Sequence, residues 1–362
     1  MKYNFKFLIF SIILLFASCK NNHTNSNLLK TNKILVNDYS TKIDSLIQTT
    51  KPRKFNGVIS ITKNGKVIYS KAFGYSDFEN KTRISLQDNF RIQSNSKQIT
   101  GVLVSKEVEK GNINLHIPIK NYLPELSASW ADTVTVHQLL NMSAGIEALD
   151  KPLLFEPGTS FHYSNPAYGL LGRILKKVTK KEYSQLANDL FKEIGMDNTY
   201  CYQLNNGNKY LINGYQWIED KFQKVNFHTL GFTNETWNDF VPTGGIISNV
   251  ADLHIWDSKL HKGELLKSES YKNMTTSNVP DLFAALSDKQ IYYGYGVDIC
   301  DKPVKYIGHG GTGFGFVSIK FYVPEKDLDV IVLENLYNSN IPINYHFEKE
   351  IRKIVINSSL VK

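Results

Sequence analysis

Three serines in this sequence are each followed by a lysine three residues later, a spacing that pairs a nucleophile with its own base. A serine hydroxyl attacks poorly until a neighbouring group takes its proton, and an uncharged amine one helical turn away can do this. The chemistry would be acyl transfer from an ester or amide, followed by hydrolysis. The pairs are Ser60/Lys63, Ser94/Lys97 and Ser359/Lys362. Because the pattern occurs three times, spacing alone does not choose among them.

The surrounding sequence favours Ser94 and Lys97. In "RIQSNSKQITG" they stand at the start of a helical pattern, where residues three apart share a face. The free N–H groups of a first helical turn also offer a positive end to an oxyanion. The first pair lies in an alternating strand pattern, where positions three apart point to opposite faces. The last pair lies at the extreme C-terminus, where order is least expected. A plain helix cap at Ser94 is the alternative interpretation.

Two further stretches carry candidate residues. In "FEPGTSFHYSNPAYGLLG", Tyr163 and Asn165 come just before a proline, so Asn165 also fits an ordinary N-cap with proline at the first helical position. "YIGHGGTGFGFVSIKFYV" formally matches a dinucleotide fingerprint, but that fingerprint requires a helix after the glycines, and a strand pattern follows here. We therefore exclude a dinucleotide site. His309-Gly310-Gly311 instead allows a substrate to approach the backbone along a sheet edge.

The elements that must position these residues follow from periodicity. An amphipathic helix over 34–50 and a hairpin around Asn64-Gly65 come first. A helix runs from Ser94 to a stop at Gly111-Asn112, residues 115–285 are mainly helical, and strands return before a last amphipathic stretch. The expected apolar face of the Ser94 helix holds Ile99, Val102, Leu103 and Val108. The predicted fold is α+β: an antiparallel sheet from both chain ends, flanked by terminal helices, with a mostly helical insertion.

In this order, Ser94-x-x-Lys97, Tyr163-x-Asn165 and His309-x-Gly311 resemble the motifs of the serine β-lactamase and penicillin-binding protein family, in its class C, DD-peptidase and esterase branch. The phrases "VHQLLNMSAGI", "GGIISNVADL" and "YVPEKDLDVIVLENL" are similar too. The resemblance covers nearly the whole chain from about residue 34. It implies a β-lactamase/transpeptidase-like fold.

The resemblance also implies a role for each residue. Ser94 would be acylated, and Lys97 and Tyr163 would share the proton transfers, with the identity of the first base left open. Asn165 would hold a substrate amide, and the backbone N–H groups of Ser94 and Thr312 would form the oxyanion hole. His309 and Gly311 would line the substrate edge. The resemblance implies no metal and no cofactor.

This chain departs from the family pattern in two places. Where penicillin-recognising members carry K-T-G, it has His309-Gly310-Gly311, although Gly311-Thr312-Gly313 is an alternative register. Histidine is mostly neutral at pH 7 and is much less suited than lysine to holding a substrate carboxylate. The second departure is a short loop, Glu147 to Leu154, which predicts a low wall on one side of the site.

The N-terminus predicts export. Residues 1–18 combine two lysines with an apolar run over 7–16, too short for a spanning helix of about 20 residues but suited to a signal peptide. "FASC" resembles a bacterial lipoprotein signal, in which Cys19 would carry the lipid. Residues 19–33 would form a polar tether of roughly 20 Å mean span, and 34–362 the hydrolase domain. We expect a membrane-anchored lipoprotein of the bacterial cell envelope.

Charge and cysteine content narrow the partners. The formal charge of +8 falls to +6 when the two signal lysines are removed, and it is spread along the chain, which argues against nucleic acid. Cys201 and Cys300 are isolated, and whether they form a disulfide stays open. We expect a small-molecule or peptide substrate, with cell-wall peptide as one option.

Taken together, the sequence predicts a serine hydrolase of D-alanyl peptides, small amides or esters. The alternatives are a true class C-like β-lactamase and a non-catalytic penicillin-binding or sensing lipoprotein.

Overall fold

The computed structural model describes residues 38–204, 208, 210–219, 221–276, 279–281, 286–287 and 291–362. One compact unit spans Tyr39–Lys362. The predicted signal peptide, the lipidation site at Cys19 and the tether over 19–33 lie outside the described residues. The expected α+β class is confirmed: strands from both ends of the chain form one antiparallel sheet, and the segment between them in the sequence is mainly helical.

The central sheet has eight strands among the described residues, in the order β10-β11-β12-β13-β14-β15-β1-β2, and every neighbouring pair is antiparallel. The strands are β1 (Gly57–Lys63), β2 (Lys66–Phe73), β10 (Val279–Asp281), β11 (Ile291–Tyr293), β12 (Asp298–Cys300), β13 (Tyr306–Gly313), β14 (Phe316–Val323) and β15 (Leu328–Glu334). β1 pairs directly with β15, so residues almost 280 positions apart lie side by side. The predicted hairpin is confirmed: Asn64 and Gly65 join β1 to β2 with φ of 51° and 68°.

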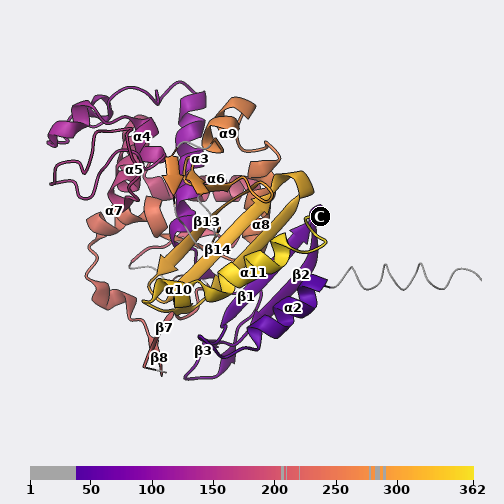
Figure 1. The fold of residues 1–362 in the computed structure, drawn as a ribbon. Helices are drawn as coiled ribbons and strands as arrows, with labels where there is room; N and C mark the ends of the chain where they lie inside the picture. Colours follow the sequence, from indigo (N-terminus) through magenta and orange to yellow (C-terminus); the bar gives the residue numbers. More distant parts are fainter. Residues whose placement is uncertain are drawn as a thin grey trace, which may run out of the picture. The chain divides into compact units, whose positions relative to one another are not determined.

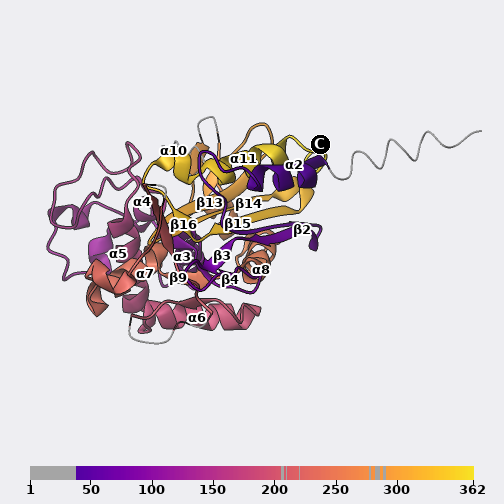
Figure 2. The same cartoon turned by 90° about the horizontal axis from the view of Figure 1, so that it is seen from below.

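The two faces of the sheet bury different cores. The terminal helices α2 (Asp38–Ile47) and α11 (His346–Ile356) cover one face, where Ile43 and Ile351 pack against sheet residues such as Ile59. Figure 1 shows both helices over the strands, and Figure 2 shows them on the opposite side from α3 and α8. Alternate strand residues point to opposite faces, so Val58 and Ile331 join the second core, which the middle of the chain supplies.

The middle of the chain is mainly helical, with short strands that the sequence pattern did not reveal. Its helices are α3 (Ser96–Glu109), α4 (Val136–Leu140), α5 (Asn165–Thr179), α6 (Tyr183–Ile194), α7 (Asn234–Gly244), α8 (Val250–His261) and α9 (Ser268–Met274). Its 3₁₀ turns are η1 (Gln93–Asn95), η2 (Ile119–Asn121), η3 (Ser129–Asp132) and η4 (Phe227–Leu230).

Small sheets complete the described residues. Their strands are β3 (Tyr75–Asp77), β4 (Thr82–Arg83), β5 (Phe90–Arg91), β6 (Tyr200–Cys201), β7 (Tyr215–Ile218), β8 (Lys221–Lys224), β9 (Ile246–Ser248) and β16 (Leu336–Tyr337). The remaining turns are η5 (Pro324–Lys326) and the short α10 (Ile341–Asn344). β5 and β6 both pair with β9, which holds the segment before Ser94 in place.

Helix α3 corrects one expectation. The pattern predicted a helix with one apolar side, but every residue from Ser96 to Ser105 is buried, because α3 packs against α5, α7 and α9. Its polar side chains are satisfied inside the core: Thr100 Oγ1 donates to the Pro242 carbonyl (2.6 Å). Periodicity identifies a helix by its solvated face, and this helix has none over that stretch.

The C-terminus also differs from the expectation of disorder. Leu360 is buried in the core beneath α11, and its carbonyl accepts a hydrogen bond from Lys63 Nζ (2.8 Å). Ser60, three residues before Lys63 in β1, points to α8 instead, which confirms that Ser60 and Lys63 cannot meet.

Cys201 and Cys300 are both buried free thiols, so they do not form a disulfide with each other.

Candidate active site

Ser94 lies in a 3₁₀ turn, η1, that leads directly into α3. The residue before it, Gln93, has φ of 51°, a left-handed conformation that is uncommon for a non-glycine residue. Gln93 is held there because it is buried and its Nε2 donates to the Gly313 carbonyl (2.7 Å). Asn95 Nδ2 donates to Ser318 Oγ (2.8 Å), which fixes the other side of the turn. The turn that carries Ser94 is therefore tied to β13 and β14 on both sides.

Lys97 is the central group of the site. Its side chain is completely buried, and Nζ lies 3.1 Å from Ser94 Oγ, 2.8 Å from Asn165 Oδ1 and 2.9 Å from the Thr243 carbonyl. These three neighbours are uncharged, and within the described ranges no carboxylate forms an ion pair with Lys97. Burial holds the pKa of Lys97 well below its usual value, and Asp298 opposes this only in part. A neutral amine beside a serine hydroxyl is suited to take its proton.

Tyr163 and Asn165 reach the same lysine from the start of α5. Lys97 Nζ lies 4.8 Å from the centroid of the Tyr163 ring, and Tyr163 is 39% exposed, so it faces both the lysine and solvent. The N-cap interpretation of Asn165 is wrong. Ser164 is the cap, since its Oγ accepts from Ala167 N (3.1 Å), and Asn165 is the first helical residue. Because the neighbouring Ser164 caps the helix, the Asn165 amide is available to Lys97.

Strand β13 forms the other wall. β12 pairs with β13 only from Tyr306 to Gly308, so among the described residues the rest of β13 has no strand partner on that side, and this part of the chain packs against the turn η1. A Cβ on Gly311 would stand 2.5 Å from the Ile92 carbonyl and 2.8 Å from Gln93 Cβ, so only glycine permits this approach. A Cβ on Gly313 would meet only the Gln93 side chain, at ordinary contact distances of 3.5 to 3.9 Å, so the demand for glycine there comes from its φ of 140° and not from a close approach. The close approach favours His309-Gly310-Gly311 as the register, with Thr312 next along the edge.

The structure thus brings together Ser94, Lys97, Tyr163, Asn165 and the β13 edge. No group of three or more His, Cys, Asp or Glu side chains that could hold a metal ion occurs among the described residues. Within the same residues, no helix has the length and apolar character needed to cross a membrane.

Comparison with known proteins places this arrangement in a family. A model described as "Beta-lactamase" matches residues 43–348. The chain belongs to the β-lactamase family. It is a serine hydrolase of that family, with Ser94 Oγ beside the buried Lys97.

Individual relatives of this β-lactamase-family chain are distant. It is 26% identical over 338 residues to "Protein flp" of Staphylococcus aureus (strain N315), an alignment that covers 85% of this chain and 65% of that protein. A D-amino acid amidase from Ochrobactrum anthropi SV3, solved with D-phenylalanine, has a similar fold (TM-score 0.74, 21% identity, 88% of this chain and 99% of that one). So has an octameric penicillin-binding protein homologue from Pyrococcus abyssi (TM-score 0.72, 23% identity, 93% and 79%).

His309 is where this member of the β-lactamase family departs most from the penicillin-recognising pattern. Its ring is buried, with Nε2 3.0 Å from the Tyr293 hydroxyl and Nδ1 2.5 Å from the Gly310 carbonyl. Burial lowers the pKa of His309 to about 3. The histidine is therefore neutral at pH 7 and offers no charge to a substrate carboxylate.

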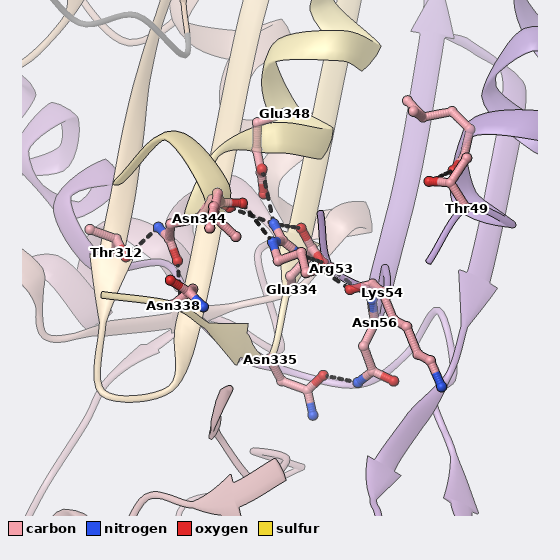
Figure 3. A network of polar contacts seen from close by, with 12 residues as sticks. Thr49, Arg53, Lys54, Asn56, Thr312, Glu334, Asn335, Asn338, Asn344 and Glu348 are labelled. Atoms are coloured by element: carbon pink, nitrogen blue, oxygen red, sulfur yellow. Dashed lines mark hydrogen bonds and ion pairs between the residues drawn. The ribbon is translucent and has the colours of Figure 1, made fainter. Parts of the chain in front are cut away.

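A buried polar network supports the Thr312 end of the edge (Figure 3). Asn344 Nδ2 donates to Thr312 Oγ1 (3.0 Å), and the Asn344 carbonyl accepts from Arg53 Nη2 (2.5 Å). Arg53 in turn forms a bidentate pair with Glu334 (2.7 and 2.8 Å). Burial and the Glu334 charge raise the pKa of Glu348, the second acid at this arginine. The network connects the proposed oxyanion strand to the α11 side of the sheet.

Sequence reasoning missed several members of the site. The Thr243 carbonyl binds Lys97, Asn344 binds Thr312, and Gln93 binds Gly313 on the β13 edge. These three residues come from separate segments of the chain. A backbone carbonyl leaves no mark in residue type, and Asn344 sits in an unremarkable polar run. Only the proximity of Gln93 to Ser94 in the chain could have pointed to its role.

Proposed function

We propose that this chain is a cell-envelope serine hydrolase that cleaves an amide or ester bond through an acyl-enzyme on Ser94. The observation that carries the proposal is the burial of Lys97 among uncharged partners, 3.1 Å from Ser94 Oγ. A charged lysine could not accept the serine proton, and this environment favours the neutral amine. A protein that bound its ligand without a covalent bond would have no use for an activated serine.

The steps follow from the positions of the groups. Lys97 accepts the Ser94 proton as Oγ attacks the substrate carbonyl, and the oxyanion forms beside the backbone N–H groups of Ser94 and Thr312. Each such donor typically contributes roughly 3 kcal/mol. Tyr163, exposed above Lys97, returns a proton to the leaving group and then assists the attack of water on the acyl-serine. Asn165 can orient a substrate amide from the same side.

His309 favours substrates without a carboxylate at the K-T-G position. A neutral, buried histidine removes one charge-assisted contact, typically worth about 1.5–3 kcal/mol, or roughly a ten- to hundredfold loss of binding. β-Lactams depend on that contact, whereas short esters and small amides do not. The fold similarity to a D-amino acid amidase is in line with a small amide substrate.

Steady-state kinetics test this proposal. We expect kcat/KM to be higher for a short p-nitrophenyl ester or a small uncharged amide than for nitrocefin. Intact-mass spectrometry after incubation with penicillin should show at most slow acylation, mapped to the tryptic peptide 92–97. Ser94→Ala should remove that adduct, and Ser359→Ala, in another Ser-x-x-Lys pair, should not.

The outcomes separate the alternatives. A kcat/KM for nitrocefin above that of every ester and peptide tried would make this chain a β-lactamase. A stable penicillin adduct without turnover of any substrate would make it a penicillin-binding sensor.

The cell-envelope location is a separate part of the proposal and rests on the "FASC" sequence at Cys19. We expect the expressed protein to fractionate with membranes and Cys19→Ala to be released or to keep its signal. A Cys19→Ala protein that is processed and located like the parent would exclude the lipid anchor.

A further inference from the structure

A second serine of this chain lies in a hydrogen-bonded relay away from Ser94. Ser60 Oγ on β1 is 2.8 Å from His254 Nε2 on α8, and His254 Nδ1 is 2.5 Å from Asp329 Oδ2 on β15. We call these three residues the α8 triad. Asp329 and Ser60 are almost fully buried, and the His254 side chain is 13% exposed.

The connectivity of the α8 triad is that of a charge-stabilised nucleophile. When Nδ1–H donates to the carboxylate, the lone pair of Nε2 is left to accept the serine proton. Serine, histidine and acid use these same ring nitrogens in serine hydrolases built on unrelated folds, which are identified by geometry rather than by position in the chain. The sheet fixes the arrangement, since Ser60 and Asp329 both point to the α8 face.

A cavity leads to Ser60. A hollow of about 520 Å³ is lined by both Ser60 and His254, and it is edged by exposed apolar side chains, Val67 (62% exposed) and Tyr210 (60% exposed). Its wall also includes the half-buried Asp88. A contact that served only to fasten α8 to the sheet would need no opening. The apolar edge and the acidic wall suit a small uncharged molecule and repel an anionic one.

The same hollow offers hydrogen-bond donors. Val250 and Ala251, the first two residues of α8, line it, and the N–H groups of a first helical turn have no partner within the helix. The N-cap side chain of Asn249 accepts from Asp252 N (3.0 Å), one residue further on. The start of α8 therefore turns its positive end toward the space beside Ser60.

We propose that Ser60 is a second nucleophile of this chain, activated by His254 and Asp329, which accepts the acyl group of small uncharged esters. Ser60 Oγ bonds to the ester carbonyl carbon as its proton moves to His254 Nε2. The carbon–oxygen bond to the alcohol then breaks, and the alcohol leaves with that proton. Water attacks the acyl-serine with the help of His254, releases the carboxylic acid and restores the Ser60 hydroxyl.

The test uses the full chain in a Ser94→Ala background, so that Ser94 cannot contribute. A fluorophosphonate probe should label this protein on the tryptic peptide 55–63, which contains Ser60. The protein should also retain slow hydrolysis of p-nitrophenyl acetate. Adding Ser60→Ala should remove both signals. Ser76→Ala, a buried strand serine that donates to the Thr82 carbonyl (3.3 Å), should leave both unchanged.

Variants of His254 and Asp329 distinguish an activated Ser60 from a Ser60 that is only accessible to the probe. His254→Gln should slow labelling about a hundredfold, the lower range for loss of a general base. If that variant does not fold, Asp329→Asn gives the decisive rate, because it removes the carboxylate that orients the imidazole. Absence of label on Ser60 in the Ser94→Ala protein would overturn the proposal. So would labelling of Ser60 at a rate that neither substitution changes.

Discussion

Two buried lysines of this protein, Lys97 and Lys320, have different surroundings and therefore different roles. Both side chains are at most 2% exposed. Lys97 contacts a hydroxyl, an amide oxygen and a carbonyl, all uncharged. Lys320 on β14 instead forms an ion pair with Asp257 on α8. The first site favours a neutral amine, and the second provides a counter-charge for an ammonium.

The difference teaches that burial alone does not make a lysine a base. Removing an ammonium from water is unfavourable, and a protein can respond by pairing the charge or by losing it. Burial raises the pKa of Asp257 to about 7, although the charge of Lys320 lowers it. Even in the paired site, burial therefore disfavours the charged carboxylate. At Lys97 burial outweighs the opposing charge of Asp298, which leaves the amine ready to take a proton.

The largest effect is expected from Lys97. Lys97→Met should lower kcat/KM for an ester about 10⁴-fold, because it removes the base and keeps the volume. It should also stabilise the fold and flatten its pH dependence. The folded chain holds Lys97 below its usual pKa of 10.5, so unfolding takes up a proton and the free energy of unfolding rises with pH up to that value. Lys97→Arg, which stays charged, should be equally inactive. An active Lys97→Arg protein would show that Lys97 is not the general base.

Lys320→Met should act on stability instead. Loss of one partner from a buried pair typically costs about 3–5 kcal/mol, because Asp257 stays behind without a counter-charge. The loss should be larger at pH 8 than at pH 5. Lys320 lowers the folded pKa of Asp257, so removing it raises that pKa further above the unfolded value of 3.8, and the variant loses more stability than the parent as pH rises. Urea unfolding at both values measures this. Lys272→Met, at an exposed position on α9, is the control.

Tyr163→Phe tests whether Lys97 acts with a partner. The ring would still cover Lys97, but the hydroxyl that serves the leaving group would be gone, so we expect kcat to fall about 10²-fold with little change in melting temperature. Substrates with better leaving groups should lose less, since they need less protonation. An equal loss for esters and amides would argue against this role.

The smallest effect is expected at Asn344, a positioning residue. Asn344→Ala should lower kcat roughly tenfold with KM nearly unchanged, because it releases Thr312 from the network in Figure 3. Thr312→Val should have a similar effect, and the double variant should be no worse than either one. Asn357→Ala, an exposed asparagine after α11, is the control. Additive losses would show that the hydrogen bond between the two is not the cause.

Local patterns of the sequence predicted much of this protein correctly. The Asn64-Gly65 hairpin, the α5 and α6 helices and the strands at the C-terminal end all follow from turn chemistry and period, because each depends on residues within a few positions of one another. Residue types and order were also enough to nominate Ser94, Lys97, Tyr163 and Asn165. A nucleophile and a base one helical turn apart leave a pattern in the sequence itself.

Only the tertiary structure decided what those residues experience. The uncharged surroundings of Lys97 come from α5 and α7, and the low pKa of His309 comes from its burial beside Tyr293. The strand pattern excludes Lys63 as a partner of Ser60, yet the fold brings Ser60 to a histidine 194 positions away. The physical reason is that pKa and reactivity depend on burial and on charges brought close by folding, and neither quantity is encoded in any short stretch of sequence.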